Sequence, residues 1–269
     1  MSSIAVTWIV GGHPYDEVAF GDMLNSLDGI ESTIVKWPEA EELFSADAID
    51  QMHREGRILA LYDLPGIRFN RGSEPDLVDP SPGVVEAWKR ITQLGVPILA
   101  MHHAIASWPT WPLFAEILKG RFHYVPAELR GQEYIDSGWA NPVQQVFDVL
   151  LPAHPICDGL PQSFELTDET YLCPIFEGEV TALISTRASR ESSNFSSAYA
   201  AIRREDQGDW FHQEESRLVA WTHKYEMSSV VYLQPGDGPL AFSNNHYRRL
   251  ISNTLYWLND ERVRDNEKR

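Results

Sequence analysis

Short runs of strand-forming residues alternate with amphipathic stretches along the first half of the chain. The runs at 4–10, 31–37, 57–62 and 96–101 predict strands. A stripe of apolar residues after Asp16 predicts a helix. A second helix is expected over 82–94, with Ser81 as its N-cap and Pro82 as its first residue. Strands that alternate with helices in this way predict an α/β fold, a doubly wound, mostly parallel sheet flanked by helices.

The second half of the chain has a less regular pattern. Further strands are expected over 143–151, 164–171, 180–185, 218–222 and 229–233. The last helix is marked by apolar residues at 247, 250, 251, 254, 255 and 258, with Ser243 or Asn244 as its cap. We expect one domain over 1–259 with insertions near 64–82 and 186–215. The charged segment 260–269 is expected to be a frayed tail.

One stretch, GVPILAMHHAIASWPTW at 95–111, combines an apolar strand, a sharp turn and the start of a helix expected to end at Gly120. Ala100 and Ala104 stand two residues on either side of His102. This spacing is typical of a nucleophile elbow, where small neighbours allow a cramped bend between strand and helix. Ser or Cys usually occupies the bend, but here His102 does, followed by His103. We predict that at least one of the two histidines is functional.

Several polar side chains follow predicted strands or lie near the end of one. In an open parallel sheet, ligands bind beyond the carboxyl ends of the strands, so residues at those ends are candidates for a site. They are His13, Asp63, His102, His103, His154, Asp168, Glu169 and His223. Taken singly, each is as readily a structural group. The pair at the bend is better placed, because the bend presents its side chain towards a ligand.

Charge and cysteine content narrow the choice of partner and compartment. The chain has 22 Lys and Arg against 39 Asp and Glu, a net charge of −17. Such a field repels phosphate backbones and anionic membrane surfaces, so neither nucleic acid nor a membrane is expected as a partner. No apolar stretch approaches about 20 residues, and the N-terminus does not resemble a signal peptide. Cys157 and Cys173 are expected to be reduced thiols of a cytoplasmic protein, with a single disulfide as the alternative.

Aromatic residues give two further hints. Trp108 and Trp111 follow the bend, where they could stack on a sugar face or pack the next helix against a loop. The insertion at 186–215 is polar but carries several aromatic residues, which would suit a lid or a subunit contact. With nine Trp in the chain, a homo-oligomer is compatible with the composition.

Four stretches in order along the chain resemble the trehalose-utilisation (ThuA-like) family, a branch of the class I glutamine amidotransferase-like superfamily. They are GGHPYD (11–16), ILAMHHAIASW (98–108), HPICDGLP with FELTDETY (154–171), and AWTHKYEMSSVVYLQPGDGPLAFSNNHYRRLISNTLYW (220–257). The resemblance implies a flavodoxin-like fold. One departure is Gly236-Asp237, where the family commonly has Gly-His, and 186–215 matches no family motif.

The resemblance implies a part in the breakdown of disaccharides or glycosides, and it places an imidazole where the superfamily has a Cys. Glutamine hydrolysis through a thioester is not expected, because position 102 carries neither Cys nor Ser. Imidazole can instead move a proton next to the carbonyl of a sugar or keto-sugar. The expected catalytic residues are His102, His103, Asp168 and Glu169. The expected substrate-binding residues are His13, Asp63, Trp108, Trp111, Tyr171 and His223.

Three questions stay open at this point. Isomerisation, elimination and hydrolysis would all use the same residues. The sequence identifies no cofactor, but a divalent metal held by nitrogen and oxygen ligands is an alternative, with the ligands drawn from His13, His102, His103 and Asp168. A non-catalytic sugar-binding or regulatory module on the same fold is the second class of function.

Overall fold

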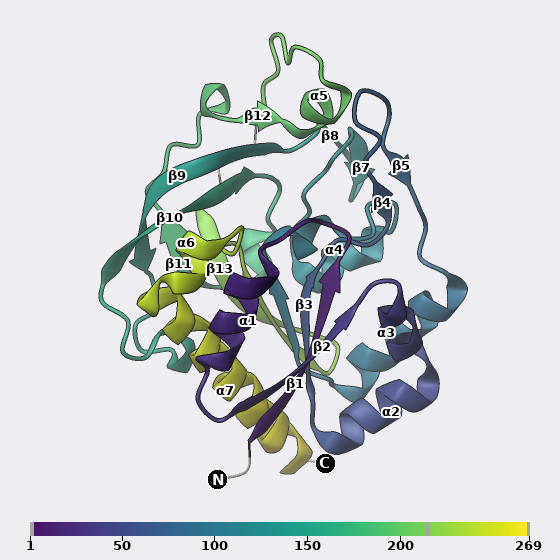
Figure 1. Cartoon of the computed structure of the whole chain (residues 1–269), viewed down its shortest axis with the longest axis vertical. Coiled ribbons are helices and arrows are strands. Elements are labelled where there is room, and N and C mark those ends of the chain that lie inside the picture. The colour runs from purple at the N-terminus through teal and green to yellow at the C-terminus, as the bar shows by residue number, and fades with distance from the viewer. Residues whose placement is uncertain (1–2, 214–215, 268–269) are drawn as a thin grey trace.

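The computed structural model describes residues 3–213 and 216–267, and it is built around one long mixed sheet (Figure 1). From one edge to the other, its strands are β10 (Ser163–Leu172), β9 (Gly138–Val149), β11 (Thr181–Thr186), β13 (Leu218–Tyr225), β14 (Ser228–Leu233), β6 (Ile98–Met101), β3 (Ile58–Asp63), β1 (Ile4–Gly11) and β2 (Ile30–Lys36). The short β12 (Ser196–Ser197) also pairs with β9. Two small hairpins complete the strands: β4 (Ile67–Arg68) with β5 (Asp76–Leu77), and β7 (Ala127–Leu129) with β8 (Gln132–Tyr134).

The sheet has two parts with different strand directions. From β2 to β14 every neighbouring pair is parallel, whereas from β14 to β10 every pair is antiparallel. The predicted fold class is confirmed, with a parallel centre flanked by helices. The antiparallel part has a consequence for the site. Strands β13 and β9 run opposite to β6. Their carboxyl ends therefore emerge at the side of the sheet where β6 begins, not where β6 ends.

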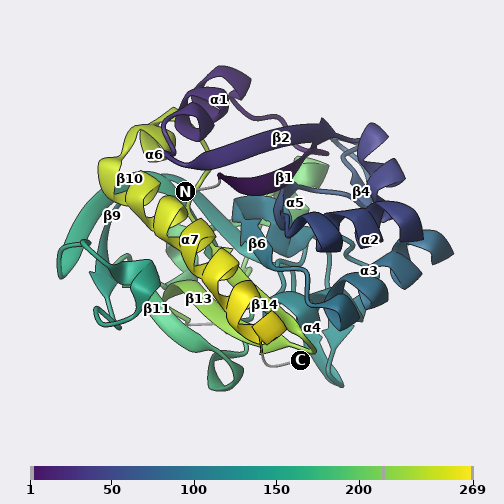
Figure 2. The ribbon, with the colours of Figure 1, turned by 90° about the horizontal axis from the view of Figure 1, so that it is seen from below.

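Helices cover both faces of the parallel part. The bounds of the helices are α1 (Glu17–Asn25), α2 (Ala46–Glu55), α3 (Pro82–Leu94), α4 (Pro112–Leu118), α5 (Ala198–Arg203) in the insertion, α6 (Pro239–Ser243) and α7 (Asn245–Glu267). Apolar residues of α1, α6 and α7 pack on one face and those of α2, α3 and α4 on the other (Figures 1 and 2). Strands β3 and β6 are buried throughout because both faces are covered. Within the described residues, none of the helices combines the length and apolarity needed to cross a membrane.

The predicted caps agree with the structure. Asp16 and Ser81 accept hydrogen bonds from the backbone at Ala19 and Val84, which are the third residues of α1 and α3. Of the two residues expected to cap the last helix, Asn244 does so, since its Oδ1 accepts from His246 N and Tyr247 N at 2.9 and 3.1 Å.

Several segments differ from the sequence-based expectation. Helix α4 begins at Pro112, because a short 3₁₀ turn (His102–Ala106) and an irregular segment follow β6. The segment expected to fray from 260 onwards is helical to Glu267, since α7 continues, while 268–269 lie outside the described residues. The insertion at 186–215 contains β12 and α5 in its described part, and residues 214–215 lie outside it.

Candidate active site

The predicted bend is a strained turn at the carboxyl end of β6. His102 has φ of 52°, a left-handed conformation that is uncommon for a residue with a side chain. The Tyr232 hydroxyl donates to the His102 carbonyl at 2.7 Å, which holds the backbone in place. Gly236 in the neighbouring loop approaches closely. A Cβ there would lie 3.0 Å from the Tyr247 hydroxyl and 3.5 Å from the His102 Cβ, at a φ of +136°. Tight packing therefore presents the imidazole in one orientation.

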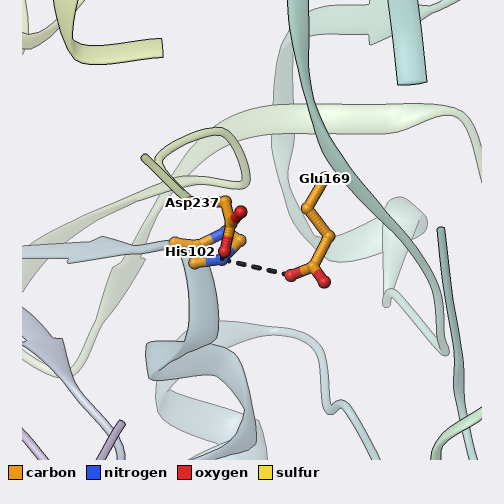
Figure 3. Close-up of side chains that lie close together, drawn as sticks. All are labelled: His102, Glu169 and Asp237. Atoms are coloured by element: carbon orange, nitrogen blue, oxygen red, sulfur yellow. Dashed lines mark ion pairs between the residues drawn. The ribbon is translucent and has the colours of Figure 1, made fainter. Parts of the chain in front are cut away.

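The His102 ring is buried and meets two carboxylates. Its Nδ1 donates to the carbonyl of Gln234 at 3.0 Å, so Nε2 points the other way. Nε2 lies 3.2 Å from Glu169 Oε2 and 3.5 Å from Asp237 Oδ1. Figure 3 shows the three side chains close together. The Tyr171 ring stacks on the imidazole, with its hydroxyl 2.9 Å from Nε2. Three segments far apart in the sequence thus converge on one nitrogen.

The carboxylates decide the charge of this group. Burial by itself disfavours a charged His102, but hydrogen bonds to Asp237 and Glu169 outweigh it and raise its pKa to about 10. The same contact with His102 lowers the pKa of Asp237. A positive charge centred on Nε2 is therefore stabilised between two negative ones. In this environment the His102 imidazole is a proton donor.

A bulge in β10 positions Asp168 and Glu169 at the site around His102. Successive residues of a regular strand point to opposite faces of the sheet. Between Asp168 and Thr170 the pairing with β9 shifts register, and this lets Glu169 reach His102 while Asp168 faces the loop after β14. Both acids lie inside β10, in agreement with the strand expected over 164–171.

Asp168 holds the loop that carries Asp237. Its two oxygens accept from the backbone N–H groups of Gly236 and Asp237, at 2.6 and 3.2 Å. Burial raises the pKa of Asp168 to about 6, although the charge of His102 opposes that change. The geometry assigns Asp168 to positioning: it fixes Asp237, whose Oδ2 also accepts from Asn141 Nδ2 at 2.7 Å.

Two more histidines lie beside His102. The His103 ring is 4.9 Å from that of His13 and 5.2 Å from that of His102. Neither of its ring nitrogens makes a hydrogen bond of good geometry within the described part of the chain. Burial lowers the pKa of His103, and the charge of His102 lowers it further. His13 is half-buried and donates from Nδ1 to the Pro14 carbonyl at 2.8 Å, so the neutral ring carries its lone pair on Nε2.

Comparisons with known proteins identify the family and the fold. The sequence profile of the trehalose utilisation family, ThuA, matches residues 33–258. The chain belongs to the ThuA family. It is similar in structure to a putative ThuA-like protein from Parabacteroides merdae, with a TM-score of 0.63, 13% identity, and 96% of this chain and 90% of that one covered. A putative ThuA-like protein from Bacteroides uniformis gives a TM-score of 0.61 at 16% identity, covering 95% and 91%.

The likeness in fold extends beyond proteins described as ThuA-like. PurLQS from Thermotoga maritima matches with a TM-score of 0.50 and 11% identity, over 95% of this chain and 99% of that one. No curated protein sequence matches the chain. At these identities the structural likeness shows the fold alone, so the roles of residues in this ThuA chain are argued from its own geometry.

Some residues expected at the ThuA site lie elsewhere. His223 is on β13, whose carboxyl end is at the opposite edge of the sheet, and its Nε2 donates to the Ile117 carbonyl at 2.8 Å. His154 follows β9 at that same opposite edge and packs against Trp257. Neither is brought to His102. The cause is the antiparallel direction of both strands, which reverses the edge at which their ends emerge.

The two tryptophans after the bend are structural in this fold. Trp108 is buried beside Trp37, with ring centroids 5.9 Å apart, and its backbone N–H donates to Pro65. Trp111 stacks on Phe114 at 6.2 Å. The structure thus favours the second of the two interpretations given for this pair, in which they pack the helix against a loop.

Asp237 is the site residue that sequence reasoning missed. The sequence did contain a hint of its role: Gly236-Asp237 stands where the resemblance to the family led us to expect Gly-His. Aspartate and histidine can both accept a proton or bind a metal. Of the four metal ligands expected, His102 alone belongs to the group of three donors found among the described residues, His102, Glu169 and Asp237. The oxygens of Asp168 are occupied by backbone N–H groups.

Asp63, at the end of β3, is buried and accepts from Trp37 Nε1 at 2.6 Å. Burial raises its pKa to about 7. The pKa of Asp63 is near 3.8 in the unfolded chain and about 7 in the folded one. The resulting contribution to folding stability is fully present at pH values below 3.8, and it is lost as the pH rises towards 7. Asp63→Asn removes the buried charge, so we expect it to be more stable than wild type at pH 8 by about 1 kcal/mol or more, with no gain near pH 4.

Urea unfolding at the two pH values measures this difference. The exposed Asp76→Asn is the matched control, because it changes the net charge equally without removing a buried charge. An Asp63→Asn variant that is no more stable than Asp76→Asn at pH 8 would show that Trp37 compensates the buried carboxylate fully.

Proposed function

We propose that this ThuA-family chain is an enzyme that moves a proton next to the carbonyl of a keto-sugar or keto-glycoside. The single observation that carries the proposal is Nε2 of His102 held between the carboxylates of Glu169 and Asp237, at the carboxyl end of the central strand β6. The family description, trehalose utilisation, supports a carbohydrate as the substrate class. A cytoplasmic location and a small-molecule partner belong to the same proposal.

The geometry favours an exchange of two roles that the sequence suggested. His102 or His103 was expected as the base, but Nε2 of His102 faces carboxylates that keep the ring protonated, so this ring is suited to carry positive charge. His13 or His223 was expected to polarise the carbonyl, but in neutral His13 Nε2 holds a lone pair, because Nδ1 donates to Pro14. We assign His13 as the base and His102 as the centre of positive charge.

The proposed reaction then balances as follows. Nε2 of His13 takes the proton from the carbon next to the carbonyl, and the electron pair of that C–H bond moves to form an enolate. The developing negative charge on the former carbonyl oxygen is stabilised at His102. Where the deprotonated carbon carries a hydroxyl, transfer of that hydroxyl's proton to the enolate oxygen and return of the first proton to the former carbonyl carbon complete an isomerisation. In an elimination, the enolate re-forms the carbonyl while a group on the β carbon departs with its bonding electron pair.

Hydrogen exchange tests this step without knowledge of the final product. Incubated with a keto-glycoside in D₂O, the enzyme is expected to replace the proton next to the carbonyl with deuterium, which NMR detects as loss of that signal. The rate should exceed the buffer rate by at least about 10³-fold. Saturable binding of the sugar with no exchange above the buffer rate would contradict the proposal and favour the non-catalytic binding module.

A further inference from the structure

Three donor atoms from separate segments face one point at the site. They are Nε2 of His102, a carboxylate oxygen of Glu169 and a carboxylate oxygen of Asp237, and all lie within 4.8 Å of one another (Figure 3). We propose that these three side chains bind one divalent ion of the first transition series, such as Mn²⁺ or Zn²⁺. The inference deepens the proposed function, on which it rests for its catalytic meaning.

The spacing of the donors fits an ion at their centre. Nitrogen and oxygen ligands lie about 2.0 to 2.2 Å from such an ion, so neighbouring ligand atoms are about 3.0 to 3.5 Å apart. Nε2 of His102 is 3.2 Å from Glu169 Oε2 and 3.5 Å from Asp237 Oδ1. Both pairs that include the imidazole therefore already have the separation that coordination requires. One imidazole with two carboxylates is a donor set that suits Mn²⁺, Fe²⁺ and Zn²⁺.

Hydrogen bonds orient two of the three donors, those of His102 and Asp237. Metal-binding imidazoles usually donate their second N–H to a carbonyl or carboxylate, and Nδ1 of His102 does so to Gln234. The oxygen of Asp237 that faces away from His102 accepts from Asn141, which leaves the nearer oxygen directed at Nε2. Neutral imidazole is the form that binds metal, so an ion would take the place of the Nε2 proton.

Exposure leaves room for a substrate oxygen on the same ion. The His102 side chain is 1% exposed, whereas those of Glu169 and Asp237 are 13% and 31% exposed. Three protein ligands with one side open are typical of catalytic centres, while structural sites are closed by a fourth. An ion here would supply positive charge at the position where the proposed enolate oxygen develops.

Metal binding by the full-length protein tests the inference without any substrate. Protein treated with EDTA and dialysed is titrated with MnCl₂ or ZnCl₂ in a calorimeter, and we expect one ion per chain. Glu169→Gln and Asp237→Asn should each weaken binding at least about tenfold, because each removes one charged ligand. Glu165→Gln on the same strand is the matched control, since Glu165 is exposed and should leave the affinity unchanged.

Circular dichroism and thermal unfolding establish that each variant is folded before titration. Wild type that binds no ion, or binds it as tightly as the Glu169→Gln, Asp237→Asn double variant, overturns the inference. That outcome leaves the proposed function standing, because a proton on His102 then provides the positive charge. Stoichiometric binding without deuterium exchange has the opposite meaning: the site holds a metal, and the proposed reaction is wrong.

Discussion

His102→Gln is expected to lower kcat/KM for a keto-glycoside by about 10³-fold or more. Removing a single preorganised donor to a developing oxyanion costs about 10²- to 10³-fold. Here the substitution also leaves Glu169 and Asp237 facing each other without the positive charge between them. The loss should appear in kcat, because the charge on the oxygen develops only as the proton leaves. Initial rates of deuterium exchange over a range of substrate concentrations measure it.

The control for His102 is another histidine that the structure removes from the site. His223→Gln should keep kcat within about twofold of wild type, since His223 lies at the opposite edge of the sheet. His102 is buried in a strained turn, so its variant is checked by thermal unfolding. Glu169→Gln, at a less buried position, should lower kcat without unfolding the chain. Full activity in both folded variants would contradict the assignment of this site.

His13→Ala is expected to lower kcat by about 10²- to 10⁴-fold, the usual contribution of a general base. KM should change much less, because the ring is assigned to proton transfer. His13 is half-buried, and truncation to Ala leaves space for a small base. Added imidazole should therefore restore part of the rate in proportion to its concentration. A variant that is not rescued and shows a raised KM instead would mean that His13 binds the substrate.

The pH profile separates these two roles of His13 as well. Burial lowers its pKa from the ordinary value of 6.5, and the charge of His102 lowers it further. The neutral base therefore persists below pH 6.5, and kcat/KM of wild type should fall only as the pH drops through this lowered pKa. His13→Ala should lose that acid limb. An identical limb in the variant would assign it to a different group.

Local sequence determined much of the fold and the centre of the site. The runs over 58–62 and 96–101 are apolar throughout, which only a strand covered on both faces can bury, and the helix caps are short-range hydrogen bonds. The position of the bend at His102 is equally local, because the small residues at 100 and 104 mark it, whereas the distant Tyr232 holds its backbone. These features depend on neighbours within a few residues, so the sequence alone predicts them.

Only the tertiary structure decided which groups meet at the bend. Because only two residues join β13 to β14, the sequence already indicates an antiparallel hairpin, but it does not indicate that β14 lies parallel beside β6. That pairing sets β13 opposite to β6 and takes His223 away from the site. The bulge that turns Glu169 towards His102, and the loop that brings Asp237 there, join residues far apart in the chain. The sequence itself determined that an imidazole stands at the strained turn. The charge on that imidazole, and its use, depend on two carboxylates that long-range packing alone places beside it.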